Sequence, residues 1–254
     1  MPVVLVEKQT PQITLITLNR PERRNALTIE LMSDLSSAIE KAAADDIQRV
    51  LILRGAGSAF CTGLDLNEAA EPHKAHASAE MVAKTLVTLS QTRLITVAVV
   101  HGAAVAGGAG IMSACDFVIA AEQTKIGYPE VRRGLVAGLV MTFLRRQLRE
   151  RDLRELLLTS ELIDAKRAQE IGLVNRVVPP SELDAAAQKI AAAILQGAPG
   201  AVTNSKRLIE ELWSSSVAED VALALRHHME ARESDEAKEG IAAFLEKRPP
   251  KWAG

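Results

Sequence analysis

The chain has 254 residues, of which 48% are hydrophobic and 24% are charged. This length and composition indicate a globular protein that buries a sizeable core, and they exclude an intrinsically disordered chain. With 30 basic and 32 acidic residues, the formal net charge is −2. The overall charge gives no electrostatic basis for binding nucleic acid or an anionic membrane, so we expect neither as a partner.

The cysteines and the N-terminal segment predict a cytoplasmic protein. Cys61 and Cys115 lie far apart among small or apolar residues, which argues against both a disulfide framework and a metal site. Residues 1–8 lack a basic leader followed by a long apolar region. No stretch reaches the roughly 20 apolar residues that span a bilayer. We therefore expect no metal and no membrane association.

The first pattern along the chain is a strand followed by a helix. Residues 13–18 mix β-branched and apolar side chains, as strands do. Leu31, Leu35 and Ile39 then recur at four-residue spacing behind Thr28, a candidate N-cap. The pattern returns in strands at 50–53, 96–100 and 117–120 and in helices at about 80–92 and after Gly108. This alternation predicts an α/β core with a largely parallel sheet.

Two turns of small residues follow strands of this core. Residues 58–66 (SAFCTGLDL) come after the second strand, and residues 101–110 (HGAAVAGGAG) come after the third and lead into a helix. A glycine turn allows close approach to the backbone, and the first N–H groups of a helix have no internal partner. One such turn can serve only helix packing. Two of them can supply two converging N–H donors for a developing negative charge.

From Gly138 onward the sequence is predominantly helical. Residues 164–171 predict a helix that ends at Gly172, and residues 173–178 predict one short strand. Residues 181–184 (SELD) match a capping box, which predicts a helix start.

A Pro/Gly break at residues 197–200 (GAPG) marks a boundary. The remainder is rich in Ala, Leu, Glu, Arg and Lys and predicts three helices. We therefore predict an α/β core at 1–197 and a helical C-terminal subdomain at 198–254.

Four segments, in this order, resemble the crotonase superfamily of enoyl-CoA hydratases and isomerases. They are residues 19–27 (NRPERRNAL), 58–66, 101–110 and 128–135 (YPEVRRGL). The resemblance covers almost the whole chain and implies a crotonase-like fold of repeated ββα units with a C-terminal helical trimerisation region. It also implies an acyl-CoA thioester substrate, no cofactor beyond the CoA moiety of that substrate, and a homotrimer or a hexamer of two trimers.

The family's shared step is formation of a thioester enolate whose oxygen is held by two backbone N–H groups. The resemblance carries these donors onto Leu64 and Gly107. The α-proton of a thioester is too weakly acidic to remove unless the enolate oxygen is stabilised. Each such donor contributes ~2.7–4 kcal/mol to stabilising the transition state. Family hydratases carry two glutamates, and their positions here hold Gly110 and Glu130. Glu130 is the one carboxylate of the pair, and we expect apolar neighbours to raise its pKa.

Gly110 leaves the exact reaction open. Addition of water to a conjugated double bond is simplest with two carboxylates, whereas one base suffices to move a proton from C2 of a 3-enoyl thioester to C4. Glu130 could also activate water with help from Asp65, Glu68 or Tyr128. Hydration of a 2-enoyl-CoA, the commonest activity that the resemblance implies, is our first expectation. Isomerisation of a 3-enoyl-CoA to a 2-enoyl-CoA is the alternative, and decarboxylase and dehydratase variants stay open.

Residues for the CoA portion also follow from the resemblance. Arg24 and Ala26 match positions that contact phosphate or pantetheine, although Arg24 could equally lie in solvent. Phe244 matches an aromatic near the acyl tunnel, and Lys247 a lysine that approaches the nucleotide; Phe244 could equally pack in a subunit interface. Residues 136–140 (VAGLV) replace a loop rich in glycine and proline, which indicates a changed acyl preference.

Other classes of site find little support. The pairs His73/His76 and His227/His228 lie outside any ligand cluster, and we expect solvated histidines rather than metal ligands. A catalytically weak scaffold or an RNA-binding family member would fit poorly with the near-neutral charge. A serine hydrolase is disfavoured because no serine lies in a Gly-x-Ser-x-Gly turn.

Overall fold

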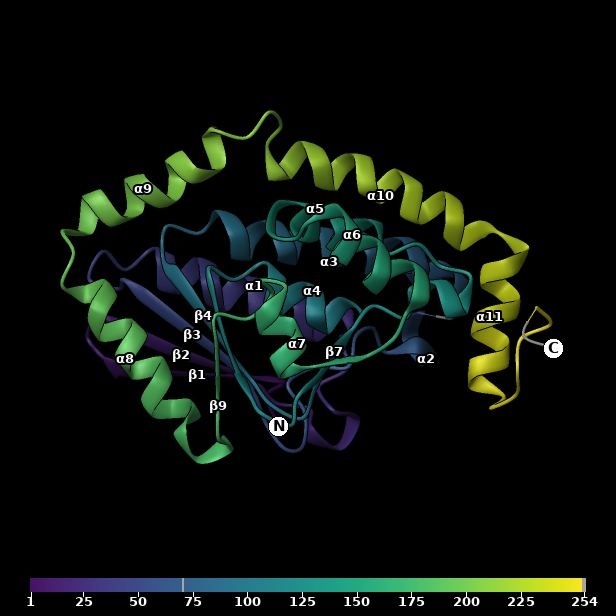
Figure 1. Ribbon diagram of the computed structural model, residues 1–254, viewed down its shortest axis with the longest axis horizontal. Coiled ribbons are helices and arrows are strands. Elements are labelled where there is room, and N and C mark those ends of the chain that lie inside the picture. Colours follow the sequence, from purple (N-terminus) through teal and green to yellow (C-terminus); the bar gives the residue numbers. More distant parts are fainter. Residues whose placement is uncertain (70, 253–254) are drawn as a thin grey trace.

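A six-stranded sheet forms the centre of the computed structural model, which describes residues 1–69 and 71–252 (Figure 1). Its strands, in sheet order, are β1 (Val4–Thr10), β2 (Ile13–Leu18), β3 (Val50–Gly55), β4 (Ile95–Val100), β6 (Phe117–Ala121) and β9 (Arg176–Val178). β1 pairs antiparallel with β2, and every other pair is parallel. The predicted α/β core with a largely parallel sheet is confirmed, whereas the edge strand β1 was not predicted.

A second, three-stranded sheet consists of β5 (Ala103–Val105), β7 (Lys125–Gly127) and β8 (Ile163–Asp164). β5 pairs parallel with β7, and β7 pairs antiparallel with β8. Strands of two or three residues are too short to show a period of two, which is why the sequence did not reveal them. This sheet places the glycine turn after β5 beside the segment that follows β7.

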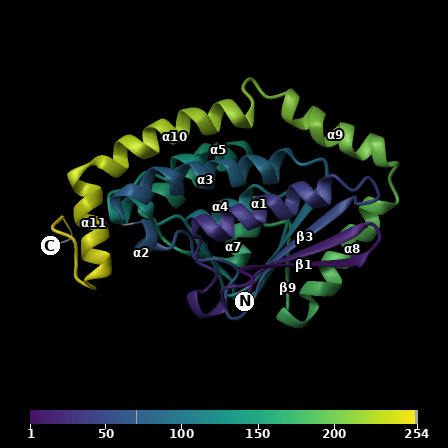
Figure 2. The same ribbon diagram turned by 180° about the vertical axis from the view of Figure 1, so that it is seen from behind.

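Both faces of the large sheet are covered by helices. Ile16 and Leu18 belong to one core cluster with α1 (Ile29–Ala43) and α3 (Pro72–Gln91). Ile13 and Leu15 belong to a second cluster with α8 (Leu183–Leu195). Figure 2 shows α1 and α3 on one side of the sheet and α8 on the other. Because both faces are buried, the central strands are continuous apolar runs rather than alternating ones.

The predicted helix boundaries are partly right. The Thr28 hydroxyl caps α1 by accepting from the Leu31 N–H at 3.2 Å, and α7 (Ala165–Glu170) begins after its N-cap Asp164. The helix predicted at 80–92 begins earlier, at Pro72, whose missing N–H is tolerated in a first turn. The capping box at 181–184 is wrong: Pro180–Glu182 form a 3₁₀ turn (η4), and α8 starts without a side-chain cap.

Three helices follow residue 198, as predicted: α9 (Pro199–Glu211), α10 (Val217–Glu233) and α11 (Asp235–Leu245). With α8 they form an arc around the rest of the molecule, with α11 at the end (Figure 1). α10 packs on α3 and on α5 (Gly138–Gln147). The remaining helical elements are η1 (Pro21–Arg23), α2 (Leu66–Ala69), α4 (Gly107–Ser113), η2 (Glu130–Arg133), α6 (Glu150–Arg154) and the π-helical η3 (Glu155–Thr159). None of the described helices is both long and apolar enough to cross a bilayer.

A buried cation fastens this arc to the core. The Arg146 side chain on α5, 9% exposed, pairs with Glu210 at 2.6 Å and with Asp220 at 2.9 Å. Its guanidinium also lies over the Trp213 ring, 5.2 Å from the centroid. One residue therefore joins α5 to the end of α9 and the start of α10.

Arg146→Met is expected to lower the free energy of unfolding by about 2–4 kcal/mol, because it leaves two partly buried carboxylates without their cation. The measurement is urea unfolding at pH 7 and low salt. The matched control is Arg145→Met, an exposed arginine on the same helix, which should change stability by less than about 0.5 kcal/mol. Equal unfolding midpoints for the two variants would contradict this role of Arg146.

Candidate active site

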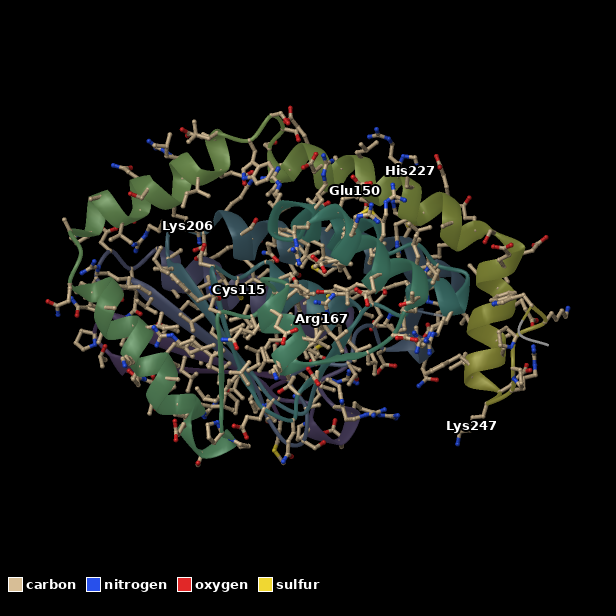
Figure 3. The ribbon with its side chains drawn as sticks, viewed as in Figure 1. Cys115, Glu150, Arg167, Lys206, His227 and Lys247 are labelled. Carbon is tan, nitrogen blue, oxygen red and sulfur yellow. The ribbon has the colours of Figure 1, made fainter. Side chains whose placement is uncertain are left out.

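A cavity of about 580 Å³ lies between the turns around Leu64 and Gly107, η2 and the C-terminal helices. Six of the seven predicted site residues line it: Arg24, Ala26, Leu64, Gly107, Glu130 and Phe244. The seventh, Lys247, is not among the lining residues; Figure 3 shows it at the far end of α11, pointing away from the body of the molecule. The fold thus gathers segments separated by more than 200 residues around one cavity.

The two predicted amide donors come from turns that touch. A Cβ added to Gly63 would lie 2.9 Å from the Ala106 Cβ and 3.4 Å from the Gly107 nitrogen. Gly63 also has φ +88°, a region that favours glycine. Both the contact and the backbone conformation therefore require glycine at this position.

Both amides are left without an acceptor. Leu27 donates to the Gly63 carbonyl and accepts from the Asp65 N–H, each at 2.8 Å, so the N–H of Leu64 between them points the other way. Gly107 is the first residue of α4 and has no intrahelical acceptor. Among the described residues neither amide donates a hydrogen bond, and both residues border the cavity.

A polar scaffold holds the first of these turns. Arg20 pairs with Asp65 at 3.1 Å, and the Asn25 amide donates to the carbonyls of Ala56 and Ala59 at 2.8 and 2.9 Å. Glu68 accepts from the N–H of Ile29 at the start of α1, at 3.1 Å. The carboxylates of Asp65 and Glu68 are therefore engaged in holding the backbone.

Glu130 supplies the buried carboxyl of the cavity. Burial raises its pKa from an ordinary 4.5 to about 7, opposed by a backbone hydrogen bond and by the positive charge of Arg133. Its Oε2 is buried and has no hydrogen-bond partner within the described chain. A carboxyl with a pKa near neutrality can both accept and return a proton at physiological pH. The pKa increase expected from apolar neighbours is thus present in the structure.

Val140 packs directly against Gly110, the position that the resemblance assigns to a second glutamate. A Cβ at Gly110 would lie 2.4 Å from Cγ1 of Val140 and 3.7 Å from Cδ2 of Leu86. Val140 belongs to the apolar segment 136–140 and itself lines the cavity. A side chain at position 110 would therefore require Val140 to move.

Tyr128 and His228 lie where the sequence did not place them. The Tyr128 side chain is fully buried, its hydroxyl lies 3.0 Å from that of Ser113, and it does not line the cavity.

His228, expected in solvent, is 7% exposed and lines the cavity. Its Nδ1–H donates to the Val136 carbonyl at 3.2 Å, and burial lowers its pKa. The prediction was wrong because α10 turns this residue of a charged tract toward α5.

Comparison with known proteins agrees with this geometry. The family profile described as Enoyl-CoA hydratase/isomerase matches residues 8–254. The chain belongs to the enoyl-CoA hydratase/isomerase family. A Thermus thermophilus protein whose name places it among the enoyl-CoA hydratases is 36% identical over 256 residues, covering 98% of this chain and 100% of that protein.

Solved structures of family members confirm the crotonase fold. The chain is similar to an enoyl-CoA hydratase from Mycobacterium avium, with a TM-score of 0.87, 31% identity and 99% coverage of both chains. It is also similar to a carnitinyl-CoA hydratase from Mycobacterium avium, with a TM-score of 0.84, 32% identity, and 99% and 98% of the two chains covered.

The contact between Gly110 and Val140 predicts a change of sign in a double-mutant cycle. Gly110→Ala in the natural sequence is expected to destabilise the protein by about 1–2 kcal/mol, because its methyl group overlaps Val140. In the Val140→Ala background the same change is expected to stabilise by up to about 1 kcal/mol, because alanine favours the helix over glycine. Urea unfolding of the four proteins measures both effects; equal effects in the two backgrounds would rule out the contact.

The raised pKa of Glu130 predicts a pH-dependent stability. Below pH 4.5 the carboxyl is protonated in the folded and unfolded states alike, and between 4.5 and about 7 only the unfolded state loses its proton. The stability therefore falls as the pH rises through this window, by up to about 3 kcal/mol. Glu130→Gln is expected to be more stable than the natural protein by about this amount at pH 8 and by much less at pH 5. A stability difference that does not change between pH 5 and pH 8 would contradict a neutral buried carboxyl.

Proposed function

We propose that this protein hydrates 2-enoyl-CoA thioesters through an enolate, with Glu130 as the single acid–base group. The observation that carries the proposal is the shared cavity of Glu130 and two free amides. A carboxyl of pKa about 7 beside paired donors is suited to moving a proton while negative charge develops on a neighbouring oxygen. The family membership and the names of the relatives support an acyl-CoA substrate.

The proposed reaction uses each group in turn. The N–H groups of Leu64 and Gly107 bind the thioester oxygen and stabilise the enolate. The Glu130 carboxylate takes a proton from water as the water oxygen bonds to C3 and the C2–C3 π electrons move into the enolate. Glu130 then returns that proton to C2. The product gains one water, and Glu130 ends as the carboxylate that began the cycle.

Arg24, Ala26 and Phe244 are proposed to hold the CoA portion and the neighbouring acyl chain. All three line the cavity. Lys247 points away from it in the single chain (Figure 3), so a contact with nucleotide would lie outside this cavity. No cofactor beyond the CoA of the substrate enters the proposed steps.

Isomerisation of a 3-enoyl-CoA to a 2-enoyl-CoA is the second candidate. The observation that favours it is Val140, whose methyl group occupies the space of a Cβ at position 110 and which lines the cavity. An apolar group there disfavours a bound water, whereas Glu130 alone could carry a proton from C2 to C4.

The first test is loss of the conjugated thioester absorbance of crotonyl-CoA, with the product analysed by mass spectrometry. We expect gain of one water, and a kcat/KM that rises with pH to a plateau above about pH 7, because Glu130 must start as the carboxylate. Glu130→Gln is expected to reduce kcat by about 10²-fold or more.

Three outcomes would change the proposal. No reaction with crotonyl-CoA, together with new conjugated absorbance from a 3-enoyl-CoA, would establish isomerisation instead. Activity that survives Glu130→Gln unchanged would remove Glu130 from the mechanism. A lack of reaction with either thioester would favour a scaffold role.

We also propose that the chain forms a trimer, or a hexamer of two trimers, through its C-terminal helices. Leu208, Ile209, Leu212 and Trp213 are 45–77% exposed and lie on or just after α9. Adjacent apolar side chains in such numbers are typical of a protein interface. Light scattering is expected to give a multiple of three chains, and Leu212→Asp to shift the mass toward the monomer. A 27.3 kDa particle for the natural protein would contradict the assembly.

A further inference from the structure

Arg133 is a cation in the cavity wall that makes no direct ion pair with the described residues. It lines the cavity, and burial lowers its pKa while the nearby charge of Glu130 opposes that shift. Its Nε is buried without a hydrogen-bond partner, and no carboxylate of the described residues lies within ion-pair distance. A partly desolvated guanidinium without a direct ion pair gains a favourable contact when a ligand supplies an anion.

The guanidinium is fixed in place by its neighbours. It lies over the Phe244 ring, 4.4 Å from the centroid, and Nη1 donates to the Pro129 carbonyl at 3.4 Å. The backbone below it is equally constrained, because a Cβ at Gly240 would lie 2.4 Å from the Arg133 carbonyl carbon. Such a guanidinium is pre-organised for an anion, since little side-chain entropy remains to be lost on binding.

The position of Arg133 relates it to the acyl group. Glu130 and Arg133 are the first and last residues of the 3₁₀ helix η2, and side chains three residues apart on such a helix lie on the same side. The charge of Arg133 also lowers the pKa of Glu130. Arg133 therefore lies beside the carboxyl that works on C2 and C3, whereas Arg23 and Arg24 line the cavity from the separate segment around η1.

We propose that Arg133 binds a carboxylate at the end of a short acyl chain, so that the preferred substrate is a carboxyacyl thioester. This inference rests on the acyl-thioester function proposed above and names the class of acyl group. A guanidinium can bind both oxygens of a carboxylate in its own plane, which gives specificity for that group over a neutral one. The other anion of the same substrate class is the CoA phosphate, and the experiment below separates the two sources.

The test is calorimetric binding of unreactive saturated thioesters that differ in one group. Glutaryl-CoA, which ends in a carboxylate, is compared with its primary amide, which has nearly the same shape. The same pair is also prepared on N-acetylcysteamine, which has no phosphate. We expect the carboxylate to bind at least tenfold more tightly than the amide on both carriers. A ratio near one in the natural protein would overturn the inference without any variant.

Variants then assign the preference to one side chain. Arg133→Gln is expected to bring the carboxylate-to-amide ratio close to one on both carriers, and Arg133→Lys to give an intermediate ratio because the planar fork is lost. The matched control is Arg132→Gln, the exposed neighbour whose guanidinium donates to the Thr159 carbonyl; its ratio should stay that of the natural protein. Thermal unfolding of each variant identifies any that fails to fold.

The remaining outcomes are decisive. If Arg133→Gln weakens both CoA thioesters equally and leaves the cysteamine thioesters unchanged, Arg133 binds a CoA phosphate and the inference fails. If the natural protein binds none of the four thioesters, the acyl-thioester function fails and takes this inference with it. Binding without a carboxylate preference refutes only the inference and leaves the proposed hydratase in place.

Discussion

The close contact between two backbone turns is the constraint on which the rest of the site depends. The turn at Gly63 meets the start of α4 so closely that even a methyl group would not fit. The free N–H groups of Leu64 and Gly107 belong to these turns, and each lacks an acceptor for a different reason: a parallel bridge on one side and a helix start on the other. Donors fixed in the backbone cost no reorganisation when charge develops beside them.

That contact is held by polar interactions at the edge of the cavity, and the backbone within it is strained. Arg20, Asn25 and Asp65 tie the first segment to the turn. On the opposite side Ala106, not glycine, has φ +51° immediately before α4. A non-glycine residue in this region is strained by about 1–3 kcal/mol, and such strain persists where surrounding structure fixes the backbone. Stability is thus given up locally to keep two amides in place.

At Glu130, too, a feature that serves the chemistry lowers the stability of the fold. Burial that raises the pKa of this carboxyl to about 7 makes proton transfer effective at neutral pH and lowers the stability of the folded protein there. The walls around it are made by elements late in the chain: α5 contributes Val140, and α11 brings Phe244 over Arg133. The chemistry available at Glu130 therefore depends on the C-terminal helices as much as on the sheet.

The sequence by itself determined the local features of this protein. Continuous apolar runs revealed the buried parallel strands, Thr28 the start of α1, and the small-residue turns the places where backbone N–H groups are free. Their order, together with Glu130 after Pro129, indicated the family. These features depend on a few adjacent residues, which is why local chemistry is enough to predict them.

Only the tertiary structure decided which side chains share the cavity. It placed Val140 in the space beside Gly110, turned His228 inward from a charged helix, and packed Phe244 against Arg133. It also separated Lys247 from the cavity (Figure 3). Contacts between segments so far apart depend on how helices pack, and no short pattern in the sequence records that packing.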